Sequence, residues 1–273
     1  MHPPIESTHT QDEFNRLKHQ VQEAWNLETR VTNYVAKTAL REFGDGPGRE
    51  AWRETLRAIL PAGRLRILDV GCGPGMFAQV CAELGHEAIG LDFSKRMIMT
   101  AESLAADREL PCQFVYGDAE EPPFPPESFD VVLSRRLLFN LPQPERAFAA
   151  WRDLVKPGGL VISMDSDPSE ASAPVKTLRR WLGLAVARVS GYREPPQPYR
   201  LDPKRFQMPH DRFPLIKSPS AMVRPFIEAQ GLTKIELVYA DRVRKARRSM
   251  EPLIERLLHP ASRPYILLAR RAD

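Results

Sequence analysis

Three glycines at alternate positions, preceded by an acid, form the stretch of this sequence with the clearest chemical potential. Asp69 is followed by Gly71, Gly73 and Gly75. The apolar run at residues 67–70 predicts a buried strand, and the pattern after the glycines predicts a helix. Glycine lets the backbone approach a ligand closely or adopt a positive φ. A strand, a glycine turn and a helix N-terminus at the carboxyl edge of a sheet predict a cofactor site.

The glycine spacing separates classes of cofactor. A dinucleotide fingerprint reads G-x-G-x-x-G and places a pyrophosphate on the helix N-terminus. This chain instead reads D-x-G-x-G-x-G, with Pro74 inside the turn. The spacing therefore disfavours a NAD(P)-dependent oxidoreductase and indicates a cofactor without a pyrophosphate.

Two further acids follow at the ends of predicted strands. Residues 87–92 end in Asp92 and residues 113–118 end in Asp118. Asp92 lies 17 residues after Gly75, close to the spacing of the acid that binds a ribose in Rossmann-like units. A carboxylate suits this role because it accepts hydrogen bonds from both vicinal hydroxyls. A single strand-end acid is usually solvated, but the ordered succession of these acids indicates a shared site.

These motifs resemble motif I and the strand-end acids of the class I S-adenosylmethionine (SAM) methyltransferases. Residues 155–162, Val-Lys-Pro-Gly-Gly-Leu-Val-Ile, are similar to the family pattern L-K-P-G-G-x-L before the fifth strand. The resemblance covers residues 66–165 and the two final strands. It implies SAM as the cofactor and S-adenosylhomocysteine as the product. It also implies that Asp118 accepts from the adenine amino group, while the backbone N–H of Ala119 meets the ring.

The segment after the fourth predicted strand, residues 134–142, lines the boundary between cofactor and acceptor in small-molecule members of this family. Many relatives carry histidine there, whereas this chain carries Arg135 and Arg136, either of which suits the cofactor carboxylate or an anionic acceptor. Tyr34, preceded by Trp25, stands where relatives fold a helix over SAM. The cofactor contacts implied by the resemblance are Tyr34, Asp69, Gly71, Cys72, Gly73, Gly75, Asp92, Phe93, Met97, Asp118, Ala119, Ser134 and Arg135.

The acceptor side is harder to predict because methyl transfer needs no fixed set of catalytic residues. An acceptor positioned in line with the methyl group and shielded from water accounts for much of the acceleration. A general base is needed only when the acceptor arrives protonated. The acceptor-side candidates are Arg136, Tyr192, Tyr199 and His210, and we expect no metal.

The strand and helix pattern predicts an α/β fold with a Rossmann-like seven-stranded sheet in the order 3-2-1-4-5-7-6, the last strand antiparallel. Four segments follow: a helical cap at 1–64, the SAM-binding core at 65–165, an inserted lid at 166–219, and a helix with a strand pair at 220–273. The cap is expected to contain helices over residues 12–27, 28–43 and 50–60. In the lid, residues 175–189 predict an amphipathic helix whose inward positions are Leu178, Leu182, Ala185, Val186 and Val189.

Composition is typical of a soluble globular protein. The chain has 273 residues, 42% hydrophobic and 27% charged. No apolar run approaches the roughly 18 residues of a membrane span, and the N-terminus lacks the pattern of a signal peptide. The three cysteines show no metal-ligand spacing. We therefore expect reduced thiols in a cytoplasmic protein without a membrane partner.

Positive charge is concentrated in the C-terminal third. Residues 171–273 hold 21 Lys and Arg against 9 Asp and Glu, with the densest run at 242–248. This asymmetry suggests either an anionic partner or a solvated basic face. An RNA or DNA methyltransferase is the alternative function, but residues 134–137 lack the Asn/Asp-Pro-Pro-aromatic motif that stacks an extruded base, and no Pro-Cys nucleophile stands in that place. Nucleic acid is therefore disfavoured as a partner.

A binding protein without catalytic activity would be expected to carry a damaged cofactor site. The acids and glycines of the site are all present in this chain. The sequence thus predicts a SAM-dependent methyltransferase that acts on N or O of a small, possibly anionic metabolite. It does not indicate the oligomeric state.

Overall fold

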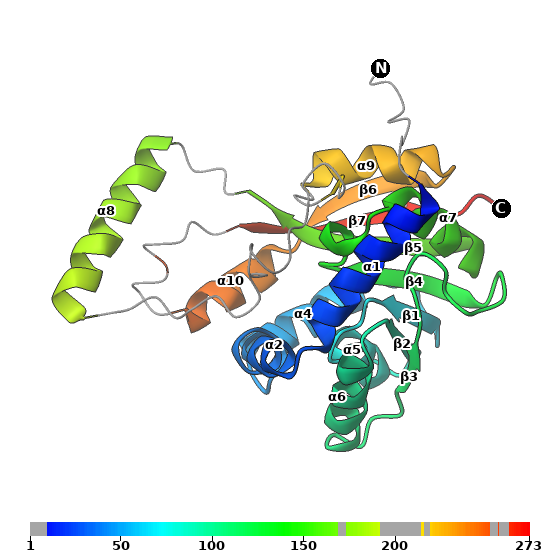
Figure 1. Ribbon diagram of the computed structural model, residues 1–273, viewed down its shortest axis with the longest axis horizontal. Helices are drawn as coiled ribbons and strands as arrows, with labels where there is room; N and C mark the ends of the chain where they lie inside the picture. Colours follow the sequence, from blue (N-terminus) through cyan, green and yellow to red (C-terminus); the bar gives the residue numbers. More distant parts are fainter. Residues whose placement is uncertain (1–9, 169–172, 192–213, 216–218, 252–255, 257–261) are drawn as a thin grey trace.

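A computed structural model describes residues 10–168, 173–191, 214–215, 219–251, 256 and 262–273. Its centre is a seven-stranded sheet in the order β3-β2-β1-β4-β5-β7-β6 (Figure 1). The strands are β1 (Arg66–Val70), β2 (Glu87–Asp92), β3 (Gln113–Tyr116), β4 (Phe129–Arg135), β5 (Val155–Asp167), β6 (Thr233–Tyr239) and β7 (Arg263–Arg270). β1 to β5 pair in parallel, while β7 is antiparallel to both β5 and β6. The predicted order and the antiparallel last strand are confirmed.

Two layers of helices bury the two faces of the sheet. Trp52 of α4 (Pro47–Ile59), Phe77 of α5 (Met76–Glu83) and Val243 of α10 (Asp241–Met250) belong to one core cluster. Trp151 of α7 (Pro144–Leu154) and Ile227 of α9 (Ser220–Ala229) belong to the other. Alternate residues of the central strands point into opposite clusters, as expected for a strand covered on both sides. α6 (Lys95–Ala106) packs on β2 and β3.

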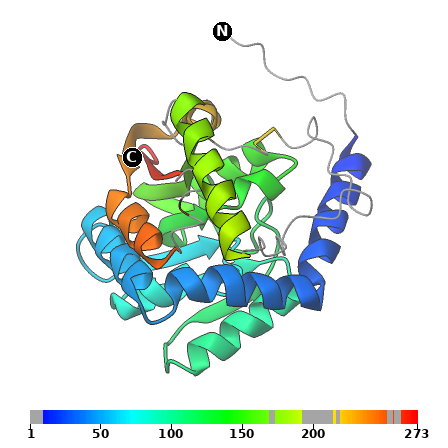
Figure 2. The ribbon, with the colours of Figure 1, turned by 90° about the vertical axis from the view of Figure 1, so that its left-hand side faces the viewer.

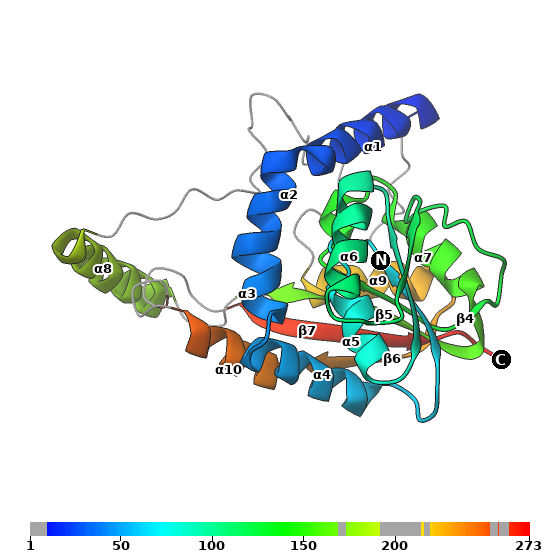
Figure 3. The ribbon, with the colours of Figure 1, turned by 90° about the horizontal axis from the view of Figure 1, so that it is seen from below.

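The N-terminal cap is an arm of consecutive helices. α1 (Gln11–Asn26) and α2 (Glu28–Tyr34) meet at Leu27, whose extended backbone turns the chain sharply (Figures 2 and 3). The helix predicted over 28–43 is continuous but is built from α2, a π-helical turn η1 (Val35–Ala39) and α3 (Leu40–Phe43). The next helix begins at Pro47 rather than at the predicted residue 50, because proline suits the first helical position.

The helix of the inserted segment forms as predicted, but the prediction of its buried face is wrong. α8 (Ala173–Ser190) stands clear of the sheet (Figures 1 and 3). Leu178 is 61% exposed and Val189 is 90% exposed; the other three positions expected inward, Leu182, Ala185 and Val186, are also exposed. Helical periodicity shows which residues share a face, but not whether another element covers that face. None of the described helices is both long enough and apolar enough to cross a membrane.

Candidate functional site

A pocket opens at the carboxyl ends of β1, β2 and β4, beneath the N-terminal cap. Its walls come from the glycine loop after β1, the end of β2, the loop after β3 and the segment after β4. The cap contributes Lys18, Trp25, Arg30, Tyr34 and Glu42. In open parallel sheets, ligands bind at the carboxyl ends of the strands, at the point where the helices that follow two neighbouring strands lie on opposite faces of the sheet.

The backbone of the glycine loop, residues 71–75, has a conformation that a residue with a side chain would adopt only under strain. Gly71, Gly73 and Gly75 have φ values of 67°, 53° and 76°. A Cβ on Gly75 would lie 2.6 Å from the Phe114 ring, and one on Gly71 would lie 2.7 Å from Leu137. Both the positive φ and the close packing therefore require glycine. At Gly73 a Cβ would meet Met97 and Tyr34 only at 4.0 Å, so there the positive φ alone favours glycine.

Asp92 is tied to the same loop. Its Oδ2 accepts from the Gly73 N–H at 2.9 Å, and its Oδ1 accepts from the Ser94 N–H at 2.8 Å. The side chain is buried, and burial raises the pKa of Asp92 to about 6 despite these backbone hydrogen bonds. The carboxylate thus lies at the pocket wall, at the edge of the glycine loop.

Asp69 lies deeper, at the end of β1. Its Oδ2 accepts from the Ala78 N–H at 3.2 Å. Burial raises the pKa of Asp69 to about 7; the Ala78 hydrogen bond opposes this rise, and the charge of Asp92 adds to it. Two buried carboxylates in one pocket favour a ligand with positive charge.

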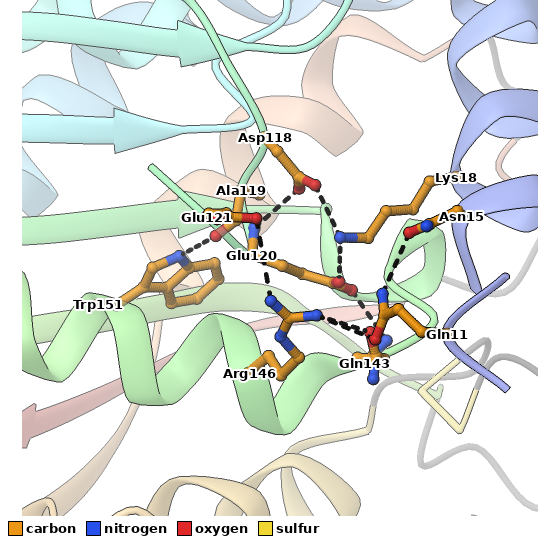
Figure 4. A network of polar contacts seen from close by, with 10 residues as sticks. All are labelled: Gln11, Asn15, Lys18, Asp118, Ala119, Glu120, Glu121, Gln143, Arg146 and Trp151. Atoms are coloured by element: carbon orange, nitrogen blue, oxygen red, sulfur yellow. Dashed lines mark hydrogen bonds and ion pairs between the residues drawn. The ribbon is translucent and has the colours of Figure 1, made fainter. Parts of the chain in front are cut away.

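The loop after β3 is clamped by a lysine from the cap. Lys18 Nζ lies 2.7 Å from Asp118 Oδ2 and 2.6 Å from Glu120 Oε2 (Figure 4). Asp118 Oδ1 accepts from the Glu120 N–H at 2.9 Å, and the Gln143 N–H donates to Glu120 Oε1 at 2.8 Å. Lys18 therefore joins α1, this loop and the residue that precedes α7. The Trp151 indole donates to the carbonyl of Ala119 at 2.9 Å and fixes the backbone beside Asp118.

The rest of the cap is held by aromatic and polar contacts. Trp25 and Tyr34 pack edge to face, with ring centroids 5.4 Å apart. The Tyr34 ring lies 4.0 Å from the position that a Cβ on Gly73 would occupy, so it covers the glycine loop. The Ser94 hydroxyl donates to the carbonyl of Trp25 at 2.8 Å and anchors the end of α1 to the core.

At the other end of the pocket, Arg135 is paired with a cap residue. Its Nη2 lies 2.7 and 2.8 Å from the two carboxylate oxygens of Glu42, and its guanidinium lies 5.1–5.6 Å from the ring centroids of Phe43, Trp52 and Phe77. Burial alone would raise the pKa of Glu42, but Arg135 and Arg247 lower it to about 2. The Arg135 charge is thus compensated within the protein. The ion pair between Arg135 at the end of β4 and Glu42 of α3 joins the cap to the sheet.

The structure brings most of the sequence-predicted cofactor residues to this one pocket. Those that line it are Tyr34, Asp69, Gly71, Cys72, Gly73, Asp92, Phe93, Met97, Asp118, Ala119 and Arg135, joined by the acceptor-side candidate Arg136. Gly75 is instead the N-cap residue before α5, and Ser134 is buried within β4. The acceptor-side candidates Tyr192, Tyr199 and His210 lie outside the described residues. Their roles, like the individual ligand contacts, stay predictions.

Sequence reasoning missed four charged residues of the pocket: Lys18, Arg30, Glu42 and Glu120. The first three belong to the cap, where no motif marks them, and Glu120 lies in the loop after β3. The one available signal was periodicity, because Arg30 lies four residues before Tyr34 on the same helical face.

Comparisons with known proteins agree with this geometry. Residues 68–163 match the family model described as a methyltransferase domain. A ubiquinone biosynthesis O-methyltransferase of Cereibacter sphaeroides is 32% identical over 169 residues, which cover 60% of this chain and 68% of that protein. A demethylmenaquinone methyltransferase of Clavibacter sepedonicus is 31% identical over 143 residues, covering 52% of this chain and 56% of that protein.

Solved structures show the same fold. A Haemonchus contortus phosphoethanolamine N-methyltransferase 2, in complex with phosphomonomethylethanolamine and S-adenosylhomocysteine, has a TM-score of 0.59 and 17% identity, covering 94% of this chain and 60% of that chain. The PH0226 protein of Pyrococcus horikoshii has a TM-score of 0.55 and 18% identity, covering 88% and 98%. With its glycine loop and buried acids in place, the chain belongs to the class I SAM-dependent methyltransferases, and its cofactor is SAM.

Proposed function

We propose that this enzyme methylates a hydroxyl oxygen of a small aromatic metabolite, such as a phenol or a quinol. The observation that carries this proposal is the continuity of one pocket. It begins at the buried acids and the glycine loop and continues to a wall that includes Phe43, Phe77 and Phe139. An aromatic acceptor would bury its ring against such side chains. The similarity to a ubiquinone biosynthesis O-methyltransferase supports an aromatic oxygen acceptor.

The residues present fit SAM. The proposed roles are Asp92 for the ribose hydroxyls, Asp118 and the Ala119 N–H for the adenine, and Asp69 for the positively charged amino-acid end. Gly73 lies on the pocket wall under Tyr34, so a ligand in the pocket would meet the glycine loop there. Lys18 already occupies Asp118 Oδ2, so the adenine amino group would share that carboxylate with the lysine.

When bound, SAM supplies an electrophilic methyl group on its sulfonium. The chain's own part is to hold the acceptor oxygen in line with that methyl group and to exclude water. The cap performs the second task, because Trp25 and Tyr34 cover the glycine loop. Arg136 lines the pocket directly after β4, and its positive charge would favour the ionised form of an acceptor hydroxyl. Tyr192, Tyr199 and His210 stay candidates for contact with the acceptor.

The alternative of an RNA or DNA methyltransferase loses its main support. The basic run that suggested it lies on α10, where acids compensate much of the charge. Arg242 pairs with Glu54 at 2.7 Å, Arg244 with Asp241 at 3.2 Å and Arg248 with Glu251 at 2.6 Å. Arg247 is half-buried, and the charge of Glu42 acts on it. The run therefore stabilises the protein's own packing and is a poor phosphate-binding surface.

The experiment that tests the proposal is methyl transfer from isotopically labelled SAM to a panel of acceptors, with mass spectrometry of the products. The panel contains catechols and phenols, their amine analogues, and tRNA. We expect label on the oxygen of an aromatic acceptor and none on tRNA. The same reaction with Asp92→Ala serves as the control and is expected to lose the signal. Label only on nitrogen, or only on tRNA, would refute the oxygen proposal.

A further inference from the structure

Exposed apolar side chains are concentrated on α8. Each of its seven large apolar residues is exposed, from 40% at Val186 to 90% at Val189, and Trp181 is 70% exposed. In the rest of the described chain, large exposed apolar side chains stand singly, six of them on six different segments. Single exposed apolar residues are ordinary on a protein surface, whereas a contiguous group of them marks a surface that binds a partner.

The apolar residues of α8 form one stripe along the helix. This apolar stripe consists of Val175, Leu178, Leu182, Ala185 and Val189, which follow the three-and-four spacing of a single helix face. All five side chains are exposed, so no other described element covers the stripe. The position of α8, clear of the sheet in Figures 1 and 3, agrees with this exposure.

The same helix is basic. Residues 173–190 include Lys176, Arg179, Arg180 and Arg188 and no acid. The helical period places these four positions outside the apolar stripe. The whole inserted stretch from residue 173 to residue 219 holds ten Lys and Arg against three Asp and Glu. Acids compensate the basic run of α10, whereas α8 has no acid of its own to do so. The helix therefore combines an uncovered apolar stripe with uncompensated positive charge.

We propose that α8 docks on an anionic lipid surface, with its apolar stripe toward the acyl chains and its basic positions among the headgroups. Trp181 suits this place, because tryptophan has an apolar ring with a polar N–H and is favoured at membrane interfaces. α8 is not apolar enough to cross a membrane, which agrees with a helix that lies in the plane of the interface. The expectation of no membrane partner rests on the absence of a spanning run, and a helix in the interface needs no such run.

Two other occupants of the apolar stripe compete with lipid: a second copy of α8 and the pocket of the same protein. Pairing two copies of α8 would bring two sets of basic residues together without an acid between them, which is unfavourable. The pocket already has an apolar cover, since Trp25 and Tyr34 of the cap lie over the glycine loop. An anionic lipid surface matches both the apolar stripe and the charge of the helix.

α8 and the pocket belong to the same edge of the sheet. β4 and β5 are parallel, so their carboxyl ends meet at one edge. The segment after β4 lines the pocket, and α8 follows the end of β5. Docking through α8 therefore brings the pocket edge of the sheet to the lipid surface. No methyl acceptor is needed to test this docking, so its outcome is separate from that of the proposed oxygen methylation.

The first test is flotation of the full chain with vesicles of phosphatidylcholine, alone or mixed with phosphatidylglycerol. We expect binding to the mixed vesicles and weaker binding at high salt, because salt screens the charges. Leu178→Gln combined with Val189→Gln should weaken binding by about tenfold or more, whereas Met99→Gln, at a similarly exposed apolar residue of α6, should not. Arg188→Gln should weaken binding by about fivefold, whereas Arg57→Gln, at an exposed arginine of α4, should not. All these side chains are exposed, so the variants should melt at the wild-type temperature.

The second test uses Trp181 as a fluorescent reporter. The other three tryptophans of the chain, Trp25, Trp52 and Trp151, are half-buried or buried. A blue shift of the emission on addition of mixed vesicles would therefore report that Trp181 leaves water. We expect this shift in the wild type and its loss in Trp181→Phe, which should still float with the vesicles.

Four results would overturn the inference. One is a wild type that does not bind the mixed vesicles, and another is binding that Leu178→Gln with Val189→Gln leaves unchanged. The third is a lipid-free dimer, measured by light scattering, that the same double variant makes monomeric; the stripe would then belong to a second copy. The fourth is a blue shift of Trp181 caused by S-adenosylhomocysteine without lipid, which would assign the stripe to the closed pocket.

Discussion

The buried pair between Glu42 and Arg135 permits a quantitative prediction for Glu42→Gln. The pKa of Glu42 falls from 4.5 to about 2 in the folded protein. That difference corresponds to about 3 kcal/mol of stabilisation at neutral pH. The figure agrees with the roughly 3–5 kcal/mol lost when one partner of a buried ion pair is removed. Because Arg135 would be left buried without its carboxylate, we expect Glu42→Gln to destabilise the protein by about 3 kcal/mol.

The assay is equilibrium urea unfolding of both proteins at pH 7 and at lower pH. A depressed folded pKa contributes stability above the unfolded value of 4.5, and this stability is lost as the pH falls toward 2. The difference in free energy of unfolding between the wild type and Glu42→Gln should therefore be largest at pH 7 and become smaller below about pH 4.5. Glu50→Gln is the matched control, because Glu50 pairs with Arg53 at 2.6 Å on the exposed surface of α4; we expect it to cost at most about 1 kcal/mol.

The reasoning is refuted if Glu42→Gln costs no more than Glu50→Gln, or if its effect is unchanged between pH 7 and pH 3. Either outcome would mean that Arg135 does not depend on Glu42. It would then be available to a ligand, as the sequence alone suggested.

Three further predictions concern the cofactor. Asp92→Asn should weaken S-adenosylhomocysteine binding about 30-fold, the loss of one hydrogen bond to a charged group, measured by titration calorimetry; unchanged affinity would contradict the ribose assignment. Lys18→Met should release α1 and so speed dissociation of S-adenosylhomocysteine in stopped-flow measurements. Lys156→Met is the control, because it breaks an equally short ion pair with Asp130 outside the pocket and should leave the dissociation rate unchanged. Equal effects of the two variants would argue against Lys18 holding the cap over the pocket. Burial raises the pKa of Asp69 to about 7, so its negative charge appears as the pH rises through 7. Binding of S-adenosylhomocysteine, which carries the ammonium group, should therefore tighten between pH 6 and 8 relative to binding of 5′-methylthioadenosine, which lacks it. Asp69→Asn should abolish the trend.

The core of the fold was predictable because its signals are local. Strands β1, β2 and β3 are short apolar runs with an acid at or near the carboxyl end, Asp69, Asp92 and Asp118, and the order of the apolar runs defined the sheet. The glycine loop was also readable, because positive φ and close packing both demand glycine at Gly71 and Gly75.

The ion pairs around the pocket were not predictable, because the two residues of each pair are distant in sequence. Lys18 and Asp118 are 100 residues apart, and Glu42 and Arg135 are 93 residues apart. The pairing with Glu42 gives Arg135 a structural contact in addition to its predicted place at the ligand, and only the folded chain shows this contact. In the same way, the apolar face of α8 was evident in the sequence, whereas its exposure depends on where the helix lies.

The central claim is that the glycine loop and the two strand-end acids hold an adenosyl group beneath the cap. A crystal structure of the protein with S-adenosylhomocysteine tests it most directly. We predict the ribose hydroxyls on the Asp92 carboxylate and the adenine between Asp118 and the Ala119 N–H, with Tyr34 over the glycine loop. Density that places the ribose and the adenine away from both acids would contradict the account.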